Sequence, residues 1–197
     1  MRGNKEEQVS KGMESNAPAC PGLLFMLSSP ATREEGFRLL MKRHGQAVYW
    51  HIRRIVVGRE DAEDVLQDTC IKVLSCLPSF RGDEAALLPW VYRIATRESL
   101  MQLRRRTHLF QSIDQLGDTL TRTLEAENGA DGSEELLLQK ALLTLTTTQR
   151  IVFGLRYFDD MSYEQMAEVT GKRVGTLKTN YHYAVERVKK YLTENSK

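Results

Sequence analysis

Apolar residues recur at helical spacing along most of this chain, and that periodicity constrains the fold more than any other feature. In VGTLKTNYHYAVERVKKYL, positions 174–192, one face is apolar: Leu177, Tyr181, Ala184, Val185, Val188 and Leu192. Similar stripes run through residues 37–56, 62–77 and 137–158. Because no segment shows the convincing alternation of a strand, the sequence predicts an all-α fold.

The stretch from Thr107 to Ser133 interrupts this periodicity. It contains three glycines and has one basic side chain against five acidic ones. Twenty-seven such residues are unusual inside one compact domain, so we expect two small helical domains joined by a flexible linker. We expect a disordered tail at 1–32, a first domain at 33–107, the linker at 108–133 and a second domain at 134–193.

Several classes of protein are disfavoured by what the sequence lacks. No apolar run approaches the roughly 20 residues of a membrane span, and the N-terminus does not resemble a secretory signal, so we expect a cytoplasmic protein without membrane insertion. Its three cysteines show neither a disulfide framework nor zinc spacing. Without a glycine-rich phosphate loop or a histidine beside a nucleophile, we expect no enzyme activity, cofactor or metal site.

The C-terminal segment has the pattern of a helix-turn-helix. Ser162 and Gln165 form a capping box that starts a short helix, and Gly171 permits the tight turn before the next helix. In such motifs the second helix presents its first residues to base edges in the major groove. The candidates for these DNA contacts are Arg173, Thr176, Lys178, Thr179, His182 and Tyr183.

Two interpretations of this helix remain open. Its polar side could be an ordinary solvated face of an amphipathic helix. However, residues 172–190 contain six basic side chains and one acidic one, a bias that favours binding to DNA phosphates.

The segment WVYRIATRESLMQLRRR, positions 90–106, combines aromatic and basic residues. It has five arginines against one acid, with Trp90 and Tyr92 among them and Phe80 shortly before. Cations neutralise phosphates and aromatic rings stack on unpaired bases, so this mixture suits single-stranded or melting DNA. A partly buried Trp90 and a basic helix end would explain the same pattern structurally.

A third segment, REDAEDVLQDT at 59–69, places carboxylates and amides opposite an apolar stripe. A surface helix does not desolvate carboxylates, and no histidine accompanies them at metal-ligand spacing. The acidic face therefore favours docking onto a basic protein surface over catalysis or metal binding.

Together these segments resemble the extracytoplasmic-function (ECF) class of bacterial sigma factors. The acidic D-x-x-Q helix, the SFRGD loop, the WVYRIA helix and the helix-turn-helix occur in the order typical of that family, over about residues 35–106 and 134–192. The resemblance implies two domains, of which one binds the promoter −10 element and the other the −35 element.

The resemblance also implies partners and residue roles. The partners are core RNA polymerase, promoter DNA and an anti-sigma factor, which in this family is often membrane-anchored. Polymerase-binding residues would be Asp61, Asp64, Gln67 and Asp68. Residues for the −10 element and the melted strand would be Phe80, Arg81, Asp83, Trp90, Tyr92, Arg93 and Arg97, with Phe80–Ala86 capturing a flipped base. The −35 element would be read by the helix-turn-helix residues named above.

Three positions depart from the family pattern. Arg97 stands where many relatives carry Asn, Arg173 where they often have a small capping residue, and Asn180 where Arg is common. Two other functions remain as alternatives: a helix-turn-helix regulator without sigma activity, and a pure interaction protein that binds polymerase or an anti-sigma factor. The 59–106 block favours the sigma factor, because a plain regulator does not need it.

Overall fold

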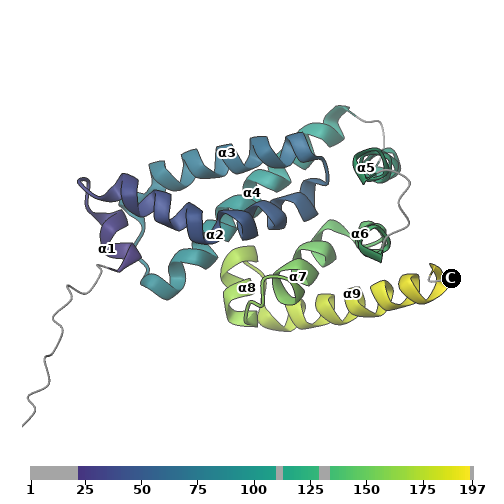
Figure 1. Cartoon of the computed structure of the whole chain (residues 1–197). Helices are drawn as coiled ribbons and strands as arrows, with labels where there is room; N and C mark the ends of the chain where they lie inside the picture. The colour runs from purple at the N-terminus through teal and green to yellow at the C-terminus, as the bar shows by residue number, and fades with distance from the viewer. Residues whose placement is uncertain (1–21, 110–112, 129–133, 196–197) are drawn as a thin grey trace, which may run out of the picture.

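The N-terminal half is a bundle of three long helices. The computed structural model describes residues 22–109, 113–128 and 134–195. Helices α2 (Arg33–Val56), α3 (Arg59–Cys76) and α4 (Glu84–Leu109) pack against one another (Figure 1), and a short 3₁₀ turn, η1 (Leu77–Ser79), leads from α3 toward α4. Their apolar stripes meet in the bundle interior, as the periodicity predicts.

The helix ends follow local chemistry. Helix α2 ends at Val56; the next residue, Val57, has φ +70° and caps this helix, and Gly58 caps the start of α3. Helix α4 begins at Glu84, where the Asp83 carboxylate accepts a hydrogen bond from the Ala86 backbone N–H at 2.9 Å. Pro89 therefore lies inside the helix.

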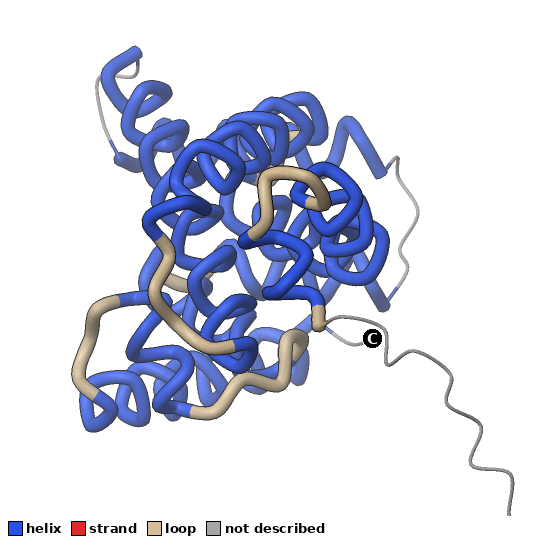
Figure 2. Tube along the Cα trace, turned by 90° about the vertical axis from the view of Figure 1, so that its left-hand side faces the viewer, coloured by secondary structure: helices blue, strands red, loops and turns tan. Residues whose placement is uncertain are grey.

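The C-terminal half is a second, smaller helical bundle. It comprises α6 (Glu134–Leu143), α7 (Thr147–Tyr157), α8 (Tyr163–Thr170) and α9 (Val174–Asn195). Helix α9 contacts α6, α7 and α8, and its Ala184 and Val188 are buried with Phe153 of α7. Within the described ranges all regular structure is helical (Figure 2), which agrees with the all-α prediction.

Two further helices form where a tail and a flexible linker were expected. Helix α1 (Leu23–Ser28) falls within the range expected to be a disordered tail. It is stabilised because its Leu23 and Leu27 are buried against α2. Helix α5 (Ile113–Asn128) occupies most of the linker. Leu120 and Leu124 of α5 pack with Val57 at the end of α2, so the linker is ordered here over this range.

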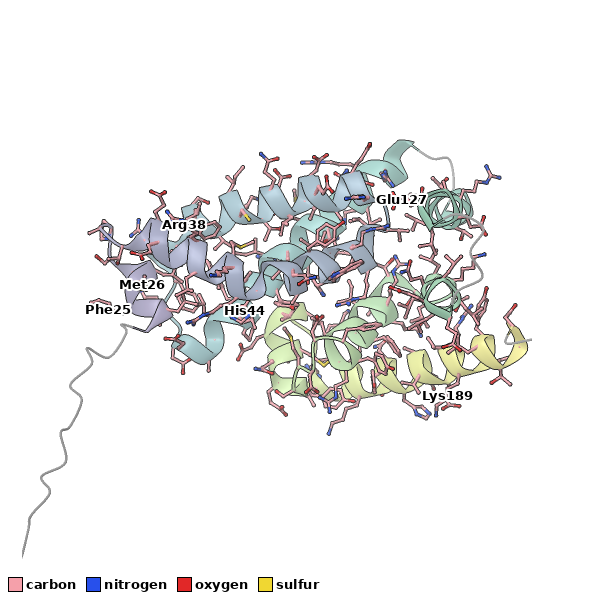
Figure 3. All side chains as sticks on the ribbon, viewed as in Figure 1. Phe25, Met26, Arg38, His44, Glu127 and Lys189 are labelled. Atoms are coloured by element: carbon pink, nitrogen blue, oxygen red, sulfur yellow. The ribbon has the colours of Figure 1, made fainter. Side chains whose placement is uncertain are left out.

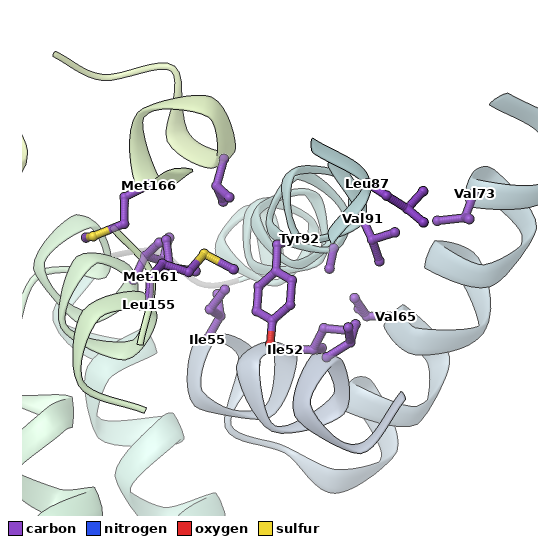
Figure 4. Packing of buried hydrophobic residues seen from close by; sticks show 14 of the residues in the cluster. Ile52, Ile55, Val65, Val73, Leu87, Val91, Tyr92, Leu155, Met161 and Met166 are labelled. Carbon is purple, nitrogen blue, oxygen red and sulfur yellow. The ribbon is translucent and has the colours of Figure 1, made fainter. Parts of the chain in front are cut away.

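The two bundles share one hydrophobic core. Residues of α2 and α4, including Ile52 and Val91, belong to the same buried cluster as Leu155 of α7 and Met166 of α8. Figure 4 shows these side chains converging around Tyr92. Helix α8 lies along α4, and α7 lies against α2. Among the described residues, no helix has both the length and the hydrophobicity to cross a membrane.

Replacing either of two glycines of α2 by alanine should change the stability of the protein, in opposite directions. At Gly36, an added Cβ would lie 2.9 Å from Met26 Cβ and 3.0 Å from the Leu27 backbone nitrogen. We expect Gly36→Ala to lower the free energy of unfolding by about 1–3 kcal/mol, because helix α1 must move.

Gly45→Ala is the matched control in the same helix. There an added Cβ would meet the flexible end of Met41 at 3.1 Å, which can shift. The higher helix propensity of alanine should then raise the free energy of unfolding by up to about 1 kcal/mol. Urea unfolding of both variants measures the difference, and a stabilising Gly36→Ala would contradict the close packing of α1.

Candidate nucleic-acid interface

The helix-turn-helix forms as the sequence predicts. The Ser162 hydroxyl accepts from the Gln165 N–H at 3.2 Å, and the Gln165 side-chain oxygen accepts from the Ser162 N–H at 2.9 Å. Gly171 has φ +70°, a conformation that favours glycine, and its N–H donates to the Ala167 carbonyl. Met166 and Leu177 are fully buried where α8 and α9 cross.

All six candidate −35 residues are exposed around the first turns of α9: Arg173, Thr176, Lys178, Thr179, His182 and Tyr183. Arg173 occupies the position before the helix, where its carbonyl accepts the Leu177 N–H at 3.1 Å. The Lys178 ammonium lies 5.5 Å from the centroid of the Tyr163 ring and pairs with no acid among the described residues. The side-chain amide of Asn180 donates to the Thr176 carbonyl of its own helix. This face can therefore offer cations and hydroxyl groups to a duplex.

The loop before α4 is compact. The Phe80 ring is half-buried and packs against Trp90, with 4.9 Å between ring centroids. An added Cβ at Gly82 would lie 2.6 Å from Phe80 Cζ, so the loop folds closely over this ring. Arg81 donates to the Pro78 carbonyl at 2.8 Å, and Asp83 caps α4. Phe80 is thus partly a core residue in this conformation, and Arg81 and Asp83 are exposed.

The candidate residues on α4 divide between surface and interior. Arg93 and Arg97 are exposed and, together with Lys172 from the turn before α9, line a cleft of about 280 Å³ between α4 and the C-terminal bundle. Trp90 is half-buried. Tyr92, in contrast, is 2% exposed, and burial raises the pKa of its phenol above the ordinary value. Tyr92 therefore does not face solvent in this arrangement.

The acidic face of α3 also differs from expectation at one residue. Asp64, Gln67 and Asp68 are exposed on the side of α3 away from the core. Asp61 is 7% exposed; it pairs with Arg106 of α4 and accepts from the Gln102 amide at 2.8 Å. In this structure Asp61 joins α3 to α4 and does not contribute to the exposed face.

Asp159 is the centre of a buried polar cluster between the two bundles. Its carboxylate accepts two bonds from Arg54, at 2.9 and 3.1 Å, and one from the Tyr92 hydroxyl at 3.2 Å. His51 Nδ1 lies 3.6 Å from the same carboxylate, while His51 Nε2 bonds Thr96 at 2.8 Å. The Asp159 side chain is 4% exposed, so these partners replace its water.

Arg150 forms a second polar contact across the same boundary. It is 5% exposed and donates to the Ile55 carbonyl at 3.1 Å, near the C-terminus of α2. Burial lowers the pKa of this guanidinium to about 10. The helix dipole of α2 favours a cation at this end, which partly compensates for the lost hydration.

The sequence gives no signal for this boundary cluster. Arg54 and Asp159 are 105 residues apart, and the Asp159-Asp160 pair by itself predicts only a turn. His51 has no ligand-spaced neighbour in the sequence. Only the packing of α7 on α2 brings these side chains together.

Comparison with known proteins decides the family. Models of sigma-70 region 2 and sigma-70 region 4 match residues 40–108 and 135–188. RNA polymerase sigma factor YlaC of Bacillus subtilis (strain 168) is 30% identical over 168 residues, covering 79% of this chain and 91% of that protein. The chain belongs to the sigma-70 family of RNA polymerase sigma factors. This assignment disfavours the plain regulator, since both sigma regions are present.

Further relatives identify the class of this sigma factor. The ECF RNA polymerase sigma-E factor of Escherichia coli (strain K12) is 30% identical over 173 residues, covering 79% of this chain and 85% of that protein. This supports membership of the ECF class, whose function is transcription initiation. Two solved structures share the fold at 22% identity and a TM-score of 0.62: CnrH in complex with the cytosolic domain of CnrY, and RpoE in complex with the anti-sigma factor NepR from Bartonella quintana. The first match covers 88% of this chain and 96% of that chain, and the second 82% and 99%.

Replacing Asp159 should weaken the contact between the bundles. Asp159→Asn leaves Arg54 without its buried counter-ion, so we expect the free energy of unfolding to fall by about 2–4 kcal/mol. The matched control is Asp160→Asn, which removes the same charge from a side chain that is 97% exposed; its effect should stay below about 0.5 kcal/mol. Urea unfolding measures both, and equal effects would contradict the importance of the cluster.

The buried histidine should make stability depend on pH. Burial lowers the pKa of His51 from 6.5, and the nearby Arg54 adds to this, whereas Asp159 opposes it. The unfolded chain then binds a proton more readily than the folded one, so the stability that the neutral imidazole provides is lost as the pH falls below about 6.5. Urea unfolding across this range should be less pH-dependent in His51→Gln than in the parent, and an unchanged slope would contradict this origin.

Proposed function

We propose that the C-terminal bundle, residues 134–193, binds the −35 element as a duplex through the start of α9. The supporting observation is the set of six exposed polar side chains that follow a capped helix and a tight turn. An N-terminal helix segment with this arrangement fits a major groove. Arg173 and Lys178 would neutralise phosphates, while Thr176, Thr179, His182 and Tyr183 are within reach of base edges or backbone.

The N-terminal bundle, residues 33–107, acts on the −10 element. The loop Phe80–Ala86 receives a base that has left the stack, and Arg93 and Arg97 bind the melted strand. Leaving the stack costs a few kcal/mol per base, which contacts in a pocket can offset. Phe80 and Trp90 supply the aromatic surface, and their mutual packing gives that surface a defined shape.

Core RNA polymerase binds the exposed face of α3. Asp64, Gln67 and Asp68 form this acidic face, which suits a basic protein surface. Asp61 supports it indirectly, by fixing α3 to α4 through Arg106. The polymerase carries out nucleotide addition, and this chain supplies promoter recognition without catalytic residues of its own. It therefore acts in the cytoplasm, with the polymerase.

An anti-sigma factor controls access to these surfaces. Two proteins of the same fold are described in complexes: CnrH with the cytosolic domain of CnrY, and the sigma factor RpoE with the anti-sigma factor NepR. In the arrangement described here, α8 covers part of α4, and Tyr92 is buried between α4 and α2 with its hydroxyl bonded to Asp159. A partner that stabilises this arrangement would keep Tyr92 from the melted strand.

Run-off transcription with purified core polymerase tests this function. Promoters are first identified by sequencing the transcripts that overexpression induces. The sigma factor should then initiate from these promoters well above core polymerase alone. No initiation above core would reject the proposed function and favour a protein that only binds polymerase or an anti-sigma factor.

Lys178 gives a test of the −35 contact. If its ammonium binds a phosphate, Lys178→Ala should weaken binding to duplexes of all sequences and reduce the slope of log K against log salt by about one. Lys189→Ala is the control, because Lys189 lies farther along the same helix beside Glu186. Fluorescence anisotropy at several salt concentrations measures both slopes. A changed sequence preference would instead make Lys178 a base-reading residue.

A further inference from the structure

Glu84 ties the loop before α4 to the N-terminus of α1. It is the first residue of α4, and its two carboxylate oxygens accept from the backbone N–H groups of Leu23 at 3.2 Å and Leu24 at 3.5 Å. These are the first amides of α1, which have no partner within their own helix. A carboxylate at this end is also favoured by the helix dipole.

The other end of α1 is fixed to α2. The Thr32 hydroxyl donates to the Met26 carbonyl at 2.9 Å, and Arg33 Nε donates to the Leu27 carbonyl at 3.2 Å. Leu23 and Leu27 are buried, whereas Phe25 is 66% exposed; Figure 3 marks Phe25 and Met26 on this helix. Helix α1 is therefore bound to the bundle at both ends and along one face.

In the sequence, Glu84 directly follows the loop residues Arg81–Asp83. Arg81 and Asp83 make side-chain hydrogen bonds only to groups within three residues of themselves, among the described contacts. Glu84 makes the side-chain bonds that connect this part of the loop to another helix. Besides the packing of Phe80 on Trp90, the loop is thus connected to the bundle through a carboxylate that is itself exposed.

Gly22 provides the space for this contact. An added Cβ at Gly22 would lie 2.9 Å from Glu84 Oε2. Any side chain there would displace the carboxylate from the α1 amides. Gly22 and Glu84 are therefore two independent positions from which the same contact can be broken.

We propose that Glu84 is a positioning residue for promoter opening: by binding the N-terminus of α1, it holds the preceding loop, Phe80–Asp83, in the shape that receives a flipped base. This role presupposes the −10 function proposed above for the loop. Glu84 touches no base itself and acts through Phe80 and its neighbours. Helix α1 thereby becomes part of the −10 apparatus.

The test uses holoenzyme assembled from the full chain and core polymerase. Two affinities are measured by fluorescence anisotropy: one for a single-stranded non-template −10 oligonucleotide from a mapped promoter, and one for its −35 duplex. Glu84→Ala should weaken oligonucleotide binding about fivefold, the value of one typical hydrogen bond, and leave duplex binding unchanged. Glu84→Gln keeps an acceptor oxygen and should recover most of the affinity.

Two further variants separate positioning from a general charge effect. Gly22→Ala should weaken oligonucleotide binding, and adding it to Glu84→Ala should cause no further loss, because both break one contact. Glu35→Ala removes an exposed carboxylate from the first turn of α2 and should bind normally.

Distinct results would overturn the proposal. It fails if Glu84→Ala binds the oligonucleotide as the parent does, if Glu35→Ala loses as much, or if the losses from Gly22→Ala and Glu84→Ala add. Failure of the underlying function looks different, because the parent holoenzyme itself would then bind no −10 oligonucleotide.

Discussion

The buried carboxylate of Asp159 makes more hydrogen bonds across the boundary between the two bundles than the other polar contact there, that of Arg150. Buried inside the shared core, it would be costly without partners, and it finds them in Arg54 of α2 and Tyr92 of α4. Hydrophobic contacts alone would tolerate some sliding between α8 and α4, whereas these directional bonds fix their relative position. The orientation of the helix-turn-helix relative to the N-terminal bundle follows from that contact.

This contact affects the two proposed DNA surfaces unequally. The candidate residues at the start of α9 are exposed. Along α4, Arg93 and Arg97 are exposed, but Tyr92 is buried, with its ring beside His51 of α2 and its hydroxyl bonded to Asp159. Duplex recognition therefore requires no rearrangement of this structure, while full access to α4 requires the bundles to part. Separation would uncover Asp159 and Arg54 together, so water would replace bonds that are now made within the protein.

Local chemistry explains which parts of this structure could be predicted from the sequence. Helical spacing gave the fold class, and the Ser162 capping box and Gly171 gave the helix-turn-helix, because each depends on residues close in the chain. The inward position of Asp61 could not be predicted, since its partner Arg106 lies 45 positions away on another helix. The same limit applies to Glu84 beside α1 and to Asp159. For the stretch 107–133, which includes α5, three glycines and the lack of periodicity suggested a linker, but packing against Val57 stabilises a helix there.

While it stays folded, helix α5 also limits the distance by which the two bundles can separate. As a helix of 16 residues it spans about 24 Å, whereas the same residues fully extended would span about 53 Å. Its contacts with the bundles include Leu120 and Leu124 on Val57, the ion pair of Glu125 with Lys140 of α6, and Glu127 (Figure 3). The Glu127 carboxylate pairs with Arg53 and accepts the Arg59 N–H at 2.8 Å. Unwinding α5 would therefore roughly double the distance that its residues can span between the two bundles.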